Sequence, residues 1–220
     1  MGIGSRIGQA LGDYRDWRLS RGTSPAARFH RNGANRLLLE GLPARSEDVV
    51  LDVGGYQGDW TAEVQWRYGC QSVVFEPVPA FQEVLSARFS CNQRIRVVNA
   101  GLASTTSISP LWVAGDGSSA FRDGGGSAID VQMLDAAEAI ETYAPTGAAC
   151  IKLNIEGAEY DVLERLLQAG VHRRVRCFLI QFHDVAPECL ERRRSIRQAL
   201  EHSHSCVFDY PFVWEKWVAK

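Results

Sequence analysis

The chain has 220 residues, of which 45% are hydrophobic and 23% charged, and its formal net charge is −2. These values fit one ordinary globular domain with a packed core, and the lack of a basic excess argues against a nucleic-acid substrate. No apolar stretch approaches the roughly 18 residues of a membrane span, and none of the six cysteines belongs to a CxxC pair. We therefore expect a cytoplasmic protein with no membrane partner.

Residues 1–45 are predicted to form an N-terminal helical extension. Residues 1–28 show no clear periodicity, whereas 29–39 have apolar residues at helical spacing. Gly41 and Pro43 then end the helical pattern.

Residues 46–220 alternate short apolar runs, typical of buried parallel strands, with amphipathic helix patterns. The expected strands are 49–53, 72–75, 95–98, 149–155, 177–182, 206–210 and 212–218, and the expected helices are 59–68, 78–89, 158–168 and 189–201. Residues 101–130 break this rhythm with a glycine run at 124–126 and are predicted to be an inserted hairpin with a mobile loop. The pattern predicts an α/β fold with a doubly wound, seven-stranded, mostly parallel sheet and an antiparallel edge strand.

The first expected strand ends in a glycine-containing loop, Asp52 to Gly58. Ligands bind at the carboxyl ends of strands in an open α/β sheet, so this loop is the expected cofactor site. Gly54 allows a tight turn, and Gly58 opens a helix whose N-terminal N–H groups favour an anion. Tyr56 stands where a second dinucleotide glycine would be, and it would crowd a pyrophosphate. The predicted cofactor-binding residues of the loop are Asp52, Gly54, Gly55, Tyr56 and Gly58.

Two further strand ends add candidates for the cofactor site. Glu76 ends the second expected strand, 24 residues after Asp52, where an acid can accept both ribose hydroxyl hydrogens. Pro77 follows it, and Asn99 and Ala100 follow the third strand at the same edge of the sheet. All four are predicted cofactor contacts.

These segments resemble the FkbM family of methyltransferases. The family's motifs correspond here to residues 52–58, 75–79, 134–135, 152–159 and 181–183, and the resemblance spans about residues 48–184. It implies a class I, Rossmann-like methyltransferase fold and S-adenosylmethionine as the cofactor. It also implies O-methylation of a hydroxyl in a small molecule, sugar or natural product.

Two positions depart from the family pattern. The family's usual aspartate in the K-x-D segment is Asn154, and an acid common before the late histidine is Gln181. Because hard divalent cations prefer carboxylate oxygens, we predict no metal site. Asn154 is expected to hydrogen-bond the substrate or the amino group of the cofactor. Lys152 is expected to pair with an acid such as Asp135 or Glu156, since an unpaired buried ammonium is costly.

Methyl transfer to a hydroxyl requires alignment of three atoms and removal of a proton. His183 follows the strand 177–182 and has an ordinary pKa that suits a base near neutral pH, so it is the first candidate. Glu156 is the second, and Asn154 completes the predicted catalytic set. Glu159 lies one turn into the next helix, where it is expected to complement the helix dipole.

Several alternatives stay open. One is an N-methyltransferase acting on RNA or protein, and another is a cofactor-binding protein of the same fold without transferase activity. A nicotinamide dehydrogenase is disfavoured by Tyr56. The expected partner is a small-molecule or sugar hydroxyl rather than nucleic acid, and a homodimer is kept open.

Other polar and aromatic residues receive structural interpretations. The arginines at 192–194 and 197 are expected to form a solvated helix face, and His204 is expected to be solvated in a polar turn. Trp214 and Trp217 are expected to pack in the core or on an edge strand.

Overall fold

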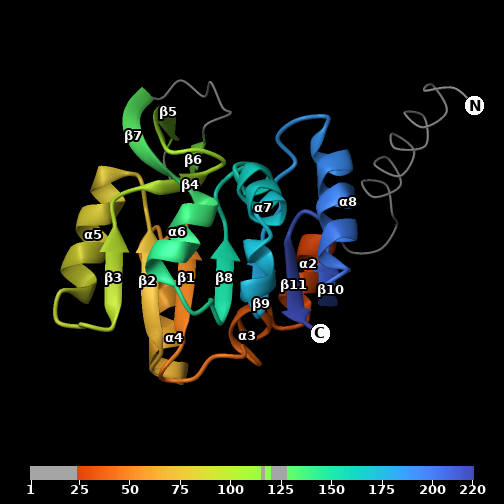
Figure 1. Ribbon diagram of the computed structural model, residues 1–220, viewed down its shortest axis with the longest axis horizontal. Coiled ribbons are helices and arrows are strands. Elements are labelled where there is room, and N and C mark those ends of the chain that lie inside the picture. Colours follow the sequence, from red (N-terminus) through yellow and green to blue (C-terminus); the bar gives the residue numbers. More distant parts are fainter. Residues whose placement is uncertain (1–23, 115–116, 120–127) are drawn as a thin grey trace, which may run out of the picture.

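A computed structural model of the chain describes residues 24–114, 117–119 and 128–220. A central sheet has helices on both faces, and a smaller second sheet lies above it (Figure 1). The glycine run, for which a mobile loop was predicted, lies outside the described residues, as do residues 1–23. Within the described part, no helix has the length and apolar character needed to cross a membrane.

The central sheet has seven strands in the order β10-β11-β9-β8-β1-β2-β3. Their bounds are β1 Val49–Val53, β2 Gln71–Phe75, β3 Ile95–Val98, β8 Cys150–Leu153, β9 Cys177–Ile180, β10 His204–Tyr210 and β11 Trp214–Ala219. The pairs among β3, β2, β1, β8 and β9 are parallel, whereas β11 is antiparallel to both β9 and β10. The predicted doubly wound sheet is confirmed, and the reversed strand β11 lies one position inside the edge strand β10.

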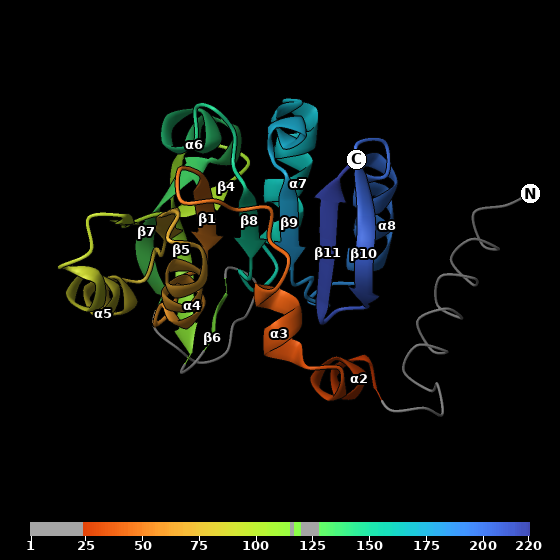
Figure 2. The ribbon, with the colours of Figure 1, turned by 90° about the horizontal axis from the view of Figure 1, so that it is seen from below.

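The helices form two layers, one on each face of the sheet (Figure 2). One layer contains α6 Ala136–Tyr143, α7 Glu159–Gln168 and α8 Cys189–Leu200, and the other contains α3 Ala34–Leu39, α4 Asp59–Tyr68 and α5 Pro79–Phe89. A short 3-10 helix, η1 Val171–Arg174, precedes β9. This three-layer arrangement leaves the carboxyl ends of the parallel strands accessible at one edge.

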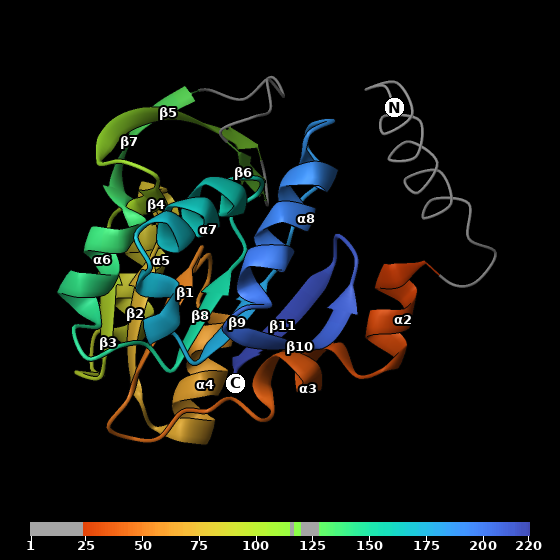
Figure 3. The same cartoon turned by 45° about the vertical axis from the view of Figure 1, so that its right-hand side comes forward.

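The segment predicted as an inserted hairpin forms a four-stranded sheet in the order β4-β7-β5-β6. The strands are β4 Gly101–Ala103, β5 Ser107–Ala114, β6 Gly117–Ser119 and β7 Ala128–Asp135. This second sheet lies beyond the carboxyl ends of the central strands, and β4 contacts α7 (Figure 3). It is larger than predicted because β4 pairs with β7, which is distant in sequence.

The second sheet joins the rest of the fold through short connections. Residues 99–100 separate β3 from β4, and β7 ends at Asp135, which is the N-cap of α6. The Asp135 carboxylate accepts hydrogen bonds from the N–H groups of Ala137 at 2.8 Å and Glu138 at 3.2 Å. This cap explains the start of α6, a helix that the sequence analysis did not predict.

The described part of the N-terminal extension consists of two helices, α2 Pro25–Arg31 and α3. The predicted continuous helix over 29–39 is wrong because Gly33 adopts a left-handed conformation (φ +83°) between them. Phe29 and Leu39 are buried in one cluster with Trp214, so both helices pack on the central sheet. Trp214 and Trp217 are buried as predicted.

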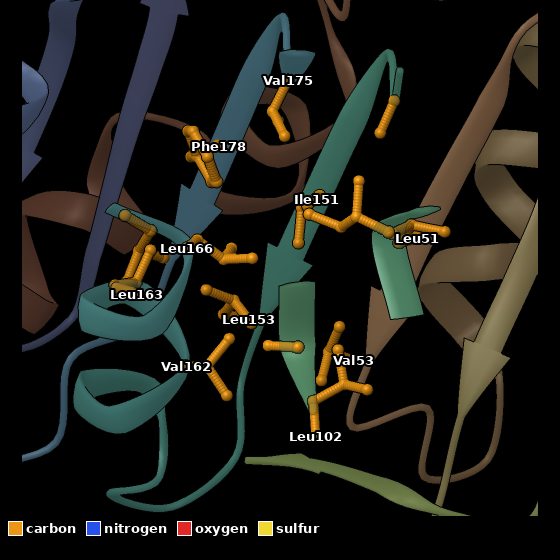
Figure 4. Close-up of a cluster of buried hydrophobic side chains, with 14 of the residues drawn as sticks. Leu51, Val53, Leu102, Ile151, Leu153, Val162, Leu163, Leu166, Val175 and Phe178 are labelled. Carbon is orange, nitrogen blue, oxygen red and sulfur yellow. The ribbon is translucent and has the colours of Figure 1, made fainter. Parts of the chain in front are cut away.

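The main core lies between the sheet and the layer that contains α7 (Figure 4). Leu51 and Ile151 come from neighbouring strands, and Val162 and Leu166 come from α7. All four are at most 1% exposed. Burial of such side chains contributes about 1.5–3 kcal/mol each, and here it fixes the strands whose ends form the site.

Two positions expected to be solvated are buried. His204 is 1% exposed, and its Nε2 lies 2.8 Å from the backbone oxygen of Val175. Arg193 is also buried, and its Nε donates to Glu215 Oε1 at 2.6 Å. Both predictions are wrong because partners distant in sequence satisfy these polar groups inside the fold.

Candidate functional site

The loop after β1 is shaped by three residues in the left-handed region, Gly54 (φ +84°), Tyr56 (φ +48°) and Gly58 (φ +85°). A Cβ atom on Gly54 would lie 2.2 Å from the backbone oxygen of Asn154, so only glycine lets the ends of β1 and β8 approach this closely. The backbone N–H of Tyr56 donates to Glu76 Oε2 at 2.9 Å. The loop therefore connects the ends of β1, β2 and β8.

Glu76 follows β2 and is 5% exposed. Its Oε1 accepts a hydrogen bond from the N–H of Val78 at 3.0 Å, and its Oε2 accepts the one from Tyr56. Burial raises the pKa of the Glu76 carboxyl, and these two N–H groups partly offset the effect. Each carboxylate oxygen can accept a further hydrogen bond, so Glu76 has the capacity to bind two ligand hydroxyls.

Asp52 and Lys152 form a buried ion pair beneath this loop. Lys152 Nζ donates to Asp52 Oδ1 at 2.8 Å and to the Gly54 oxygen at 2.7 Å, and Thr61 Oγ1 donates to Asp52 Oδ2 at 2.6 Å. Lys152 pairs with an acid, as predicted, but the acid is Asp52 and not Asp135 or Glu156, because Asp52 and Lys152 are in register on the neighbouring strands β1 and β8.

A cavity of about 310 Å³ lies at the carboxyl ends of β1, β2 and β8. The second sheet covers it, and we call the lining residues of β4, β5 and β7 the roof. The roof is mostly apolar and includes Leu102, Leu111, Val131 and Met133. The polar groups that line the cavity come mainly from the central sheet and from α7.

The structure brings half of the predicted site residues together around the cavity. Those that line it are Gly54, Tyr56, Glu76, Pro77, Asn154 and Glu156. Those that do not line it are Asp52, Gly55, Gly58, Asn99, Ala100 and His183. At the end of β3, the cavity is lined by the next two residues, Gly101 and Leu102, in place of Asn99 and Ala100.

Gly55 and Gly58 face neighbouring side chains. A Cβ atom on Gly55 would lie 2.2 Å from Val74 Cγ1, and one on Gly58 would lie 2.6 Å from the Phe89 ring. Both glycines therefore allow the loop to pack closely against β2 and α5.

His183 lies between two carboxylates. Its Nε2 is 3.5 Å from Glu156 Oε1, and its Nδ1 is 3.2 Å from Glu159 Oε1. Burial acts to lower the pKa of His183, but the two glutamates outweigh this effect and raise the pKa to about 9. The premise that this imidazole is half-neutral near pH 7 is wrong, because the side chain is a cation there.

Glu159 and Glu156 differ in exposure. Glu159 is fully buried, and its Oε2 accepts a hydrogen bond from the N–H of Gly157 at 2.9 Å. Glu156 has a side chain that is 38% exposed and a left-handed backbone (φ +52°), and it lines the cavity. A non-glycine residue in this region is strained, a feature that clusters at functional sites.

Asp161 is a cavity-lining acid that the sequence analysis did not identify. It lies in the first turn of α7, where an acid is usually explained by the helix dipole. Arg192 on α8 lies 2.5 Å from Asp161 Oδ1 and 2.7 Å from Glu164 Oε2. The sequence could have indicated Asp161 by its position, because it lies about one helical turn after the segment that contains Glu156.

The site has a polar atom suited to a cofactor amino group. Asn154 Oδ1 is buried and has no hydrogen-bond partner, and a buried acceptor without a donor is costly. The amino group of S-adenosylmethionine is such a donor, and Glu76 can accept the ribose hydroxyls, so the residues fit this cofactor. Within the described ranges, no cluster of three or more His, Cys, Asp or Glu side chains is placed to hold a metal ion.

The strand order with its reversed β11, and a cavity at the carboxyl ends of β1, β2 and β8, define a class I methyltransferase. A family model described as the methyltransferase FkbM domain matches residues 52–210. The chain belongs to the FkbM methyltransferase family, and its cofactor is S-adenosylmethionine. The comparison with curated protein sequences finds no match.

Several solved structures share the fold. A putative rRNA methylase from Clostridium thermocellum is 8% identical, with a TM-score of 0.54 over 86% of this chain and 94% of the other. A fibrillarin pre-rRNA processing protein from Methanococcus jannaschii is 13% identical, with a TM-score of 0.50 over 82% and 70%. A dimethyladenosine transferase from Plasmodium falciparum is 13% identical, with a TM-score of 0.50 over 86% and 62%. At these identities the likeness concerns the fold alone.

Proposed function

We propose that the protein transfers the methyl group of S-adenosylmethionine to a hydroxyl oxygen of a small molecule, sugar or other natural product. The observation that carries this proposal is Glu156, a cavity-lining carboxylate with the cationic His183 next to it. A hydroxyl acceptor needs a positioned base, because its proton must leave as the new C–O bond forms. Glu156 offers a carboxylate for this purpose.

The proposed steps use the chain's own residues as follows. Bound S-adenosylmethionine supplies a methyl group on a positively charged sulfur, which leaves as a neutral thioether. Glu156 accepts the hydroxyl proton and passes it to solvent, and Asn154 orients the reactants through its unpaired oxygen. His183, first predicted as the base, is assigned a positioning role, because an imidazolium cannot accept a proton.

The acceptor class is tested with methyl-labelled S-adenosylmethionine and cell extract separated into metabolite, RNA and protein fractions. We expect the label in a metabolite, and mass-spectrometric fragmentation should locate it in a methoxy group. Label in RNA, in protein or on nitrogen would instead establish the N-methyltransferase alternative. Cofactor binding with no labelled fraction would support a binding protein without transferase activity.

We predict that Glu76→Ala weakens S-adenosylmethionine binding by about 1–3 kcal/mol, the usual cost of losing a charged hydrogen bond. Isothermal titration calorimetry measures the effect, and circular dichroism checks that the variant is folded. Glu76→Gln is the matched variant, because it keeps one acceptor oxygen and should lose less affinity. Equal affinity in Glu76→Ala and wild type would remove Glu76 from the cofactor site.

We also predict that activity survives EDTA. Asn154 provides no anionic oxygen where the FkbM family pattern usually has an aspartate, and magnesium and calcium prefer anionic oxygen ligands. The measurement compares turnover before and after chelation, with added magnesium as the control. Loss of turnover that magnesium restores would contradict the prediction.

A cytoplasmic location is proposed because all six cysteines are free thiols, as expected in a reducing compartment.

The boundary of the N-terminal extension at residue 45 and the homodimer stay predictions. Limited proteolysis and size-exclusion chromatography with light scattering test them.

A further inference from the structure

The Glu159 carboxylate joins two segments of the site that are distant in sequence. Its Oε1 accepts a hydrogen bond from the backbone N–H of His183 at 2.6 Å, and its Oε2 accepts one from the N–H of Gly157 at 2.9 Å. His183 lies just after the end of β9, and Gly157 lies just after the end of β8. One side chain of α7 therefore fixes the ends of two neighbouring strands relative to each other.

The first turn of α7 holds both backbone polar groups of His183. Glu159 accepts from the His183 N–H, and the next residue, Tyr160, donates from its hydroxyl to the His183 oxygen at 2.8 Å. The ring is held too, because its Nδ1 lies 3.2 Å from Glu159 Oε1. The other ring nitrogen, Nε2, is then directed towards Glu156, whose Oε1 is 3.5 Å away. The orientation of the imidazole is thus set by α7.

Glu159 also supports the backbone next to Glu156. Glu156 and Gly157 are consecutive residues with positive φ, +52° and +111°. Gly157 is buried, so its N–H needs an acceptor inside the fold, and the Glu159 carboxylate provides it. This hydrogen bond stabilises the turn that places Glu156 in the cavity lining.

The helix dipole alone does not account for these contacts. An acid in the first turn of a helix can complement the dipole while it is exposed to water. The Glu159 side chain is 0% exposed, and a buried carboxylate is costly unless it is paired and hydrogen-bonded. Here the partners are the His183 ring and two backbone N–H groups, and charge-assisted hydrogen bonds are about twice as strong as neutral ones. The burial of Glu159 is therefore explained by the groups that it holds.

We propose that Glu159 is a positioning residue for methyl transfer, which keeps His183 as an imidazolium directed at Glu156 and fixes the turn on which Glu156 lies. An imidazolium beside a carboxylate favours its ionised form, which is the form that a base requires. Glu159 does not line the cavity, so it acts through these two residues. Its effect on turnover rests on the proposed role of Glu156 as the base, whereas its hold on His183 does not and is measured without an acceptor.

The first experiment follows the His183 imidazole by nuclear magnetic resonance titration in wild type, Glu159→Gln and Glu164→Gln. Burial lowers the pKa of His183, but Glu156 and Glu159 together raise it to about 9. We expect Glu159→Gln to lower this pKa by roughly one unit or more, because one of the two anions is lost. Glu164→Gln is the matched control, since Glu164 lies on the same helix but pairs with Arg192, and it should leave the pKa nearly unchanged.

A second variant, Glu159→Asp, separates the charge of the side chain from its reach. Aspartate keeps the negative charge but is one methylene shorter, so it should preserve more of the raised pKa of His183 than glutamine does. It should also lose the hydrogen bond to Gly157, and amide hydrogen exchange at Gly157 should then be faster than in wild type. A thermal melt shows whether each variant is folded. If neither is folded, wild type alone tests the hold, because a His183 that titrates near its ordinary value of about 6.5 would overturn it.

The effect on the reaction is measured as turnover with the identified acceptor. We expect Glu159→Gln to lower kcat by roughly 10- to 10²-fold, as for a small misplacement of a reacting group, and to change the KM for S-adenosylmethionine less. Its rate should also fall as the pH rises through the lowered pKa of His183, at a pH where the wild-type rate has no such step. The double variant with Glu156→Gln should lose no more turnover than Glu156→Gln alone, because Glu159 acts through Glu156.

An unchanged pKa of His183 in Glu159→Gln would overturn the proposal. An additional loss of turnover in the double variant would overturn it as well, because Glu159 would then act independently of Glu156. Near-normal turnover in Glu156→Gln would contradict the proposed base instead, and the titration of His183 would still decide whether Glu159 holds the imidazolium.

Discussion

Replacing Glu156 with glutamine is expected to lower turnover by about 10²- to 10⁴-fold, the usual contribution of a positioned base. The substitution keeps the size and one acceptor oxygen of the side chain but removes its capacity to take the hydroxyl proton. Affinity for S-adenosylmethionine should change by much less, because one charge of several around the cavity is lost. Single-turnover kinetics with the identified acceptor, together with calorimetry, separate the two effects.

Glu164→Gln is the control for this variant, because Glu164 lies on the same helix, α7, outside the cavity lining. Near-normal turnover in Glu156→Gln would refute the assignment of the base. A further check is the pH profile: with the pKa of His183 raised to about 9, its titration should produce no step in the rate near pH 6–7. A nuclear magnetic resonance titration of the imidazole measures this pKa directly.

The same pKa shift affects stability in a defined direction. The pKa of His183 is higher in the folded state than the value of about 6.5 in an unfolded chain. Its contribution to folding is therefore complete below about pH 6.5 and is lost as the pH rises through about 9. Unfolding in urea at several pH values should show this loss in wild type and not in His183→Ala.

Replacing Lys152 with methionine is expected to destabilise the fold by about 3–5 kcal/mol, the typical cost of leaving one member of a buried ion pair unpaired. The Asp52 side chain is 1% exposed and the Lys152 side chain 8%, so water cannot replace the lost ammonium. The substitution also removes a hydrogen bond to the Gly54 oxygen. Equilibrium unfolding in urea, followed by fluorescence and circular dichroism, measures the change.

The double variant Lys152→Met with Asp52→Asn distinguishes an unpaired charge from a general loss of packing. Removing both charges should recover most of the stability, since a neutral asparagine still accepts the hydrogen bond from Thr61. If the double variant is as unstable as Lys152→Met, the cost lies in packing. A change below about 0.5 kcal/mol in Lys152→Met, as for an ordinary surface site, would contradict the prediction.

The central sheet and part of the site were predictable because they follow from local patterns and a general rule. The loop at Gly54 and the acid Glu76 both end strands with clear apolar runs, and the carboxyl ends of parallel strands meet at one edge. Strand register could also have identified the partner of Lys152, since Asp52 lies opposite it on β1. That inference requires the knowledge that β1 and β8 are neighbours in the sheet, and Asp52 and Lys152 lie 100 residues apart in the chain.

The roof and the charge of His183 were not predictable in the same way. The roof depends on pairing between Gly101–Ala103 and strand β7, which lies far along the chain. The raised pKa of His183 depends on Glu156 and Glu159, which approach it only when the end of β9 meets the start of α7 and the residues just before it. In both cases contacts that are non-local in sequence override the local pattern.

The short connections of the second sheet have a consequence for its movement. Only residues 99–100 link it to β3, and Asp135 both ends β7 and caps α6. A lid needs hinge residues that absorb a large change in backbone angles, and at these two connections such a change would fall on residues 99–100 and on Asp135. A movement of the second sheet as one body should therefore disturb the cap of α6 at Asp135.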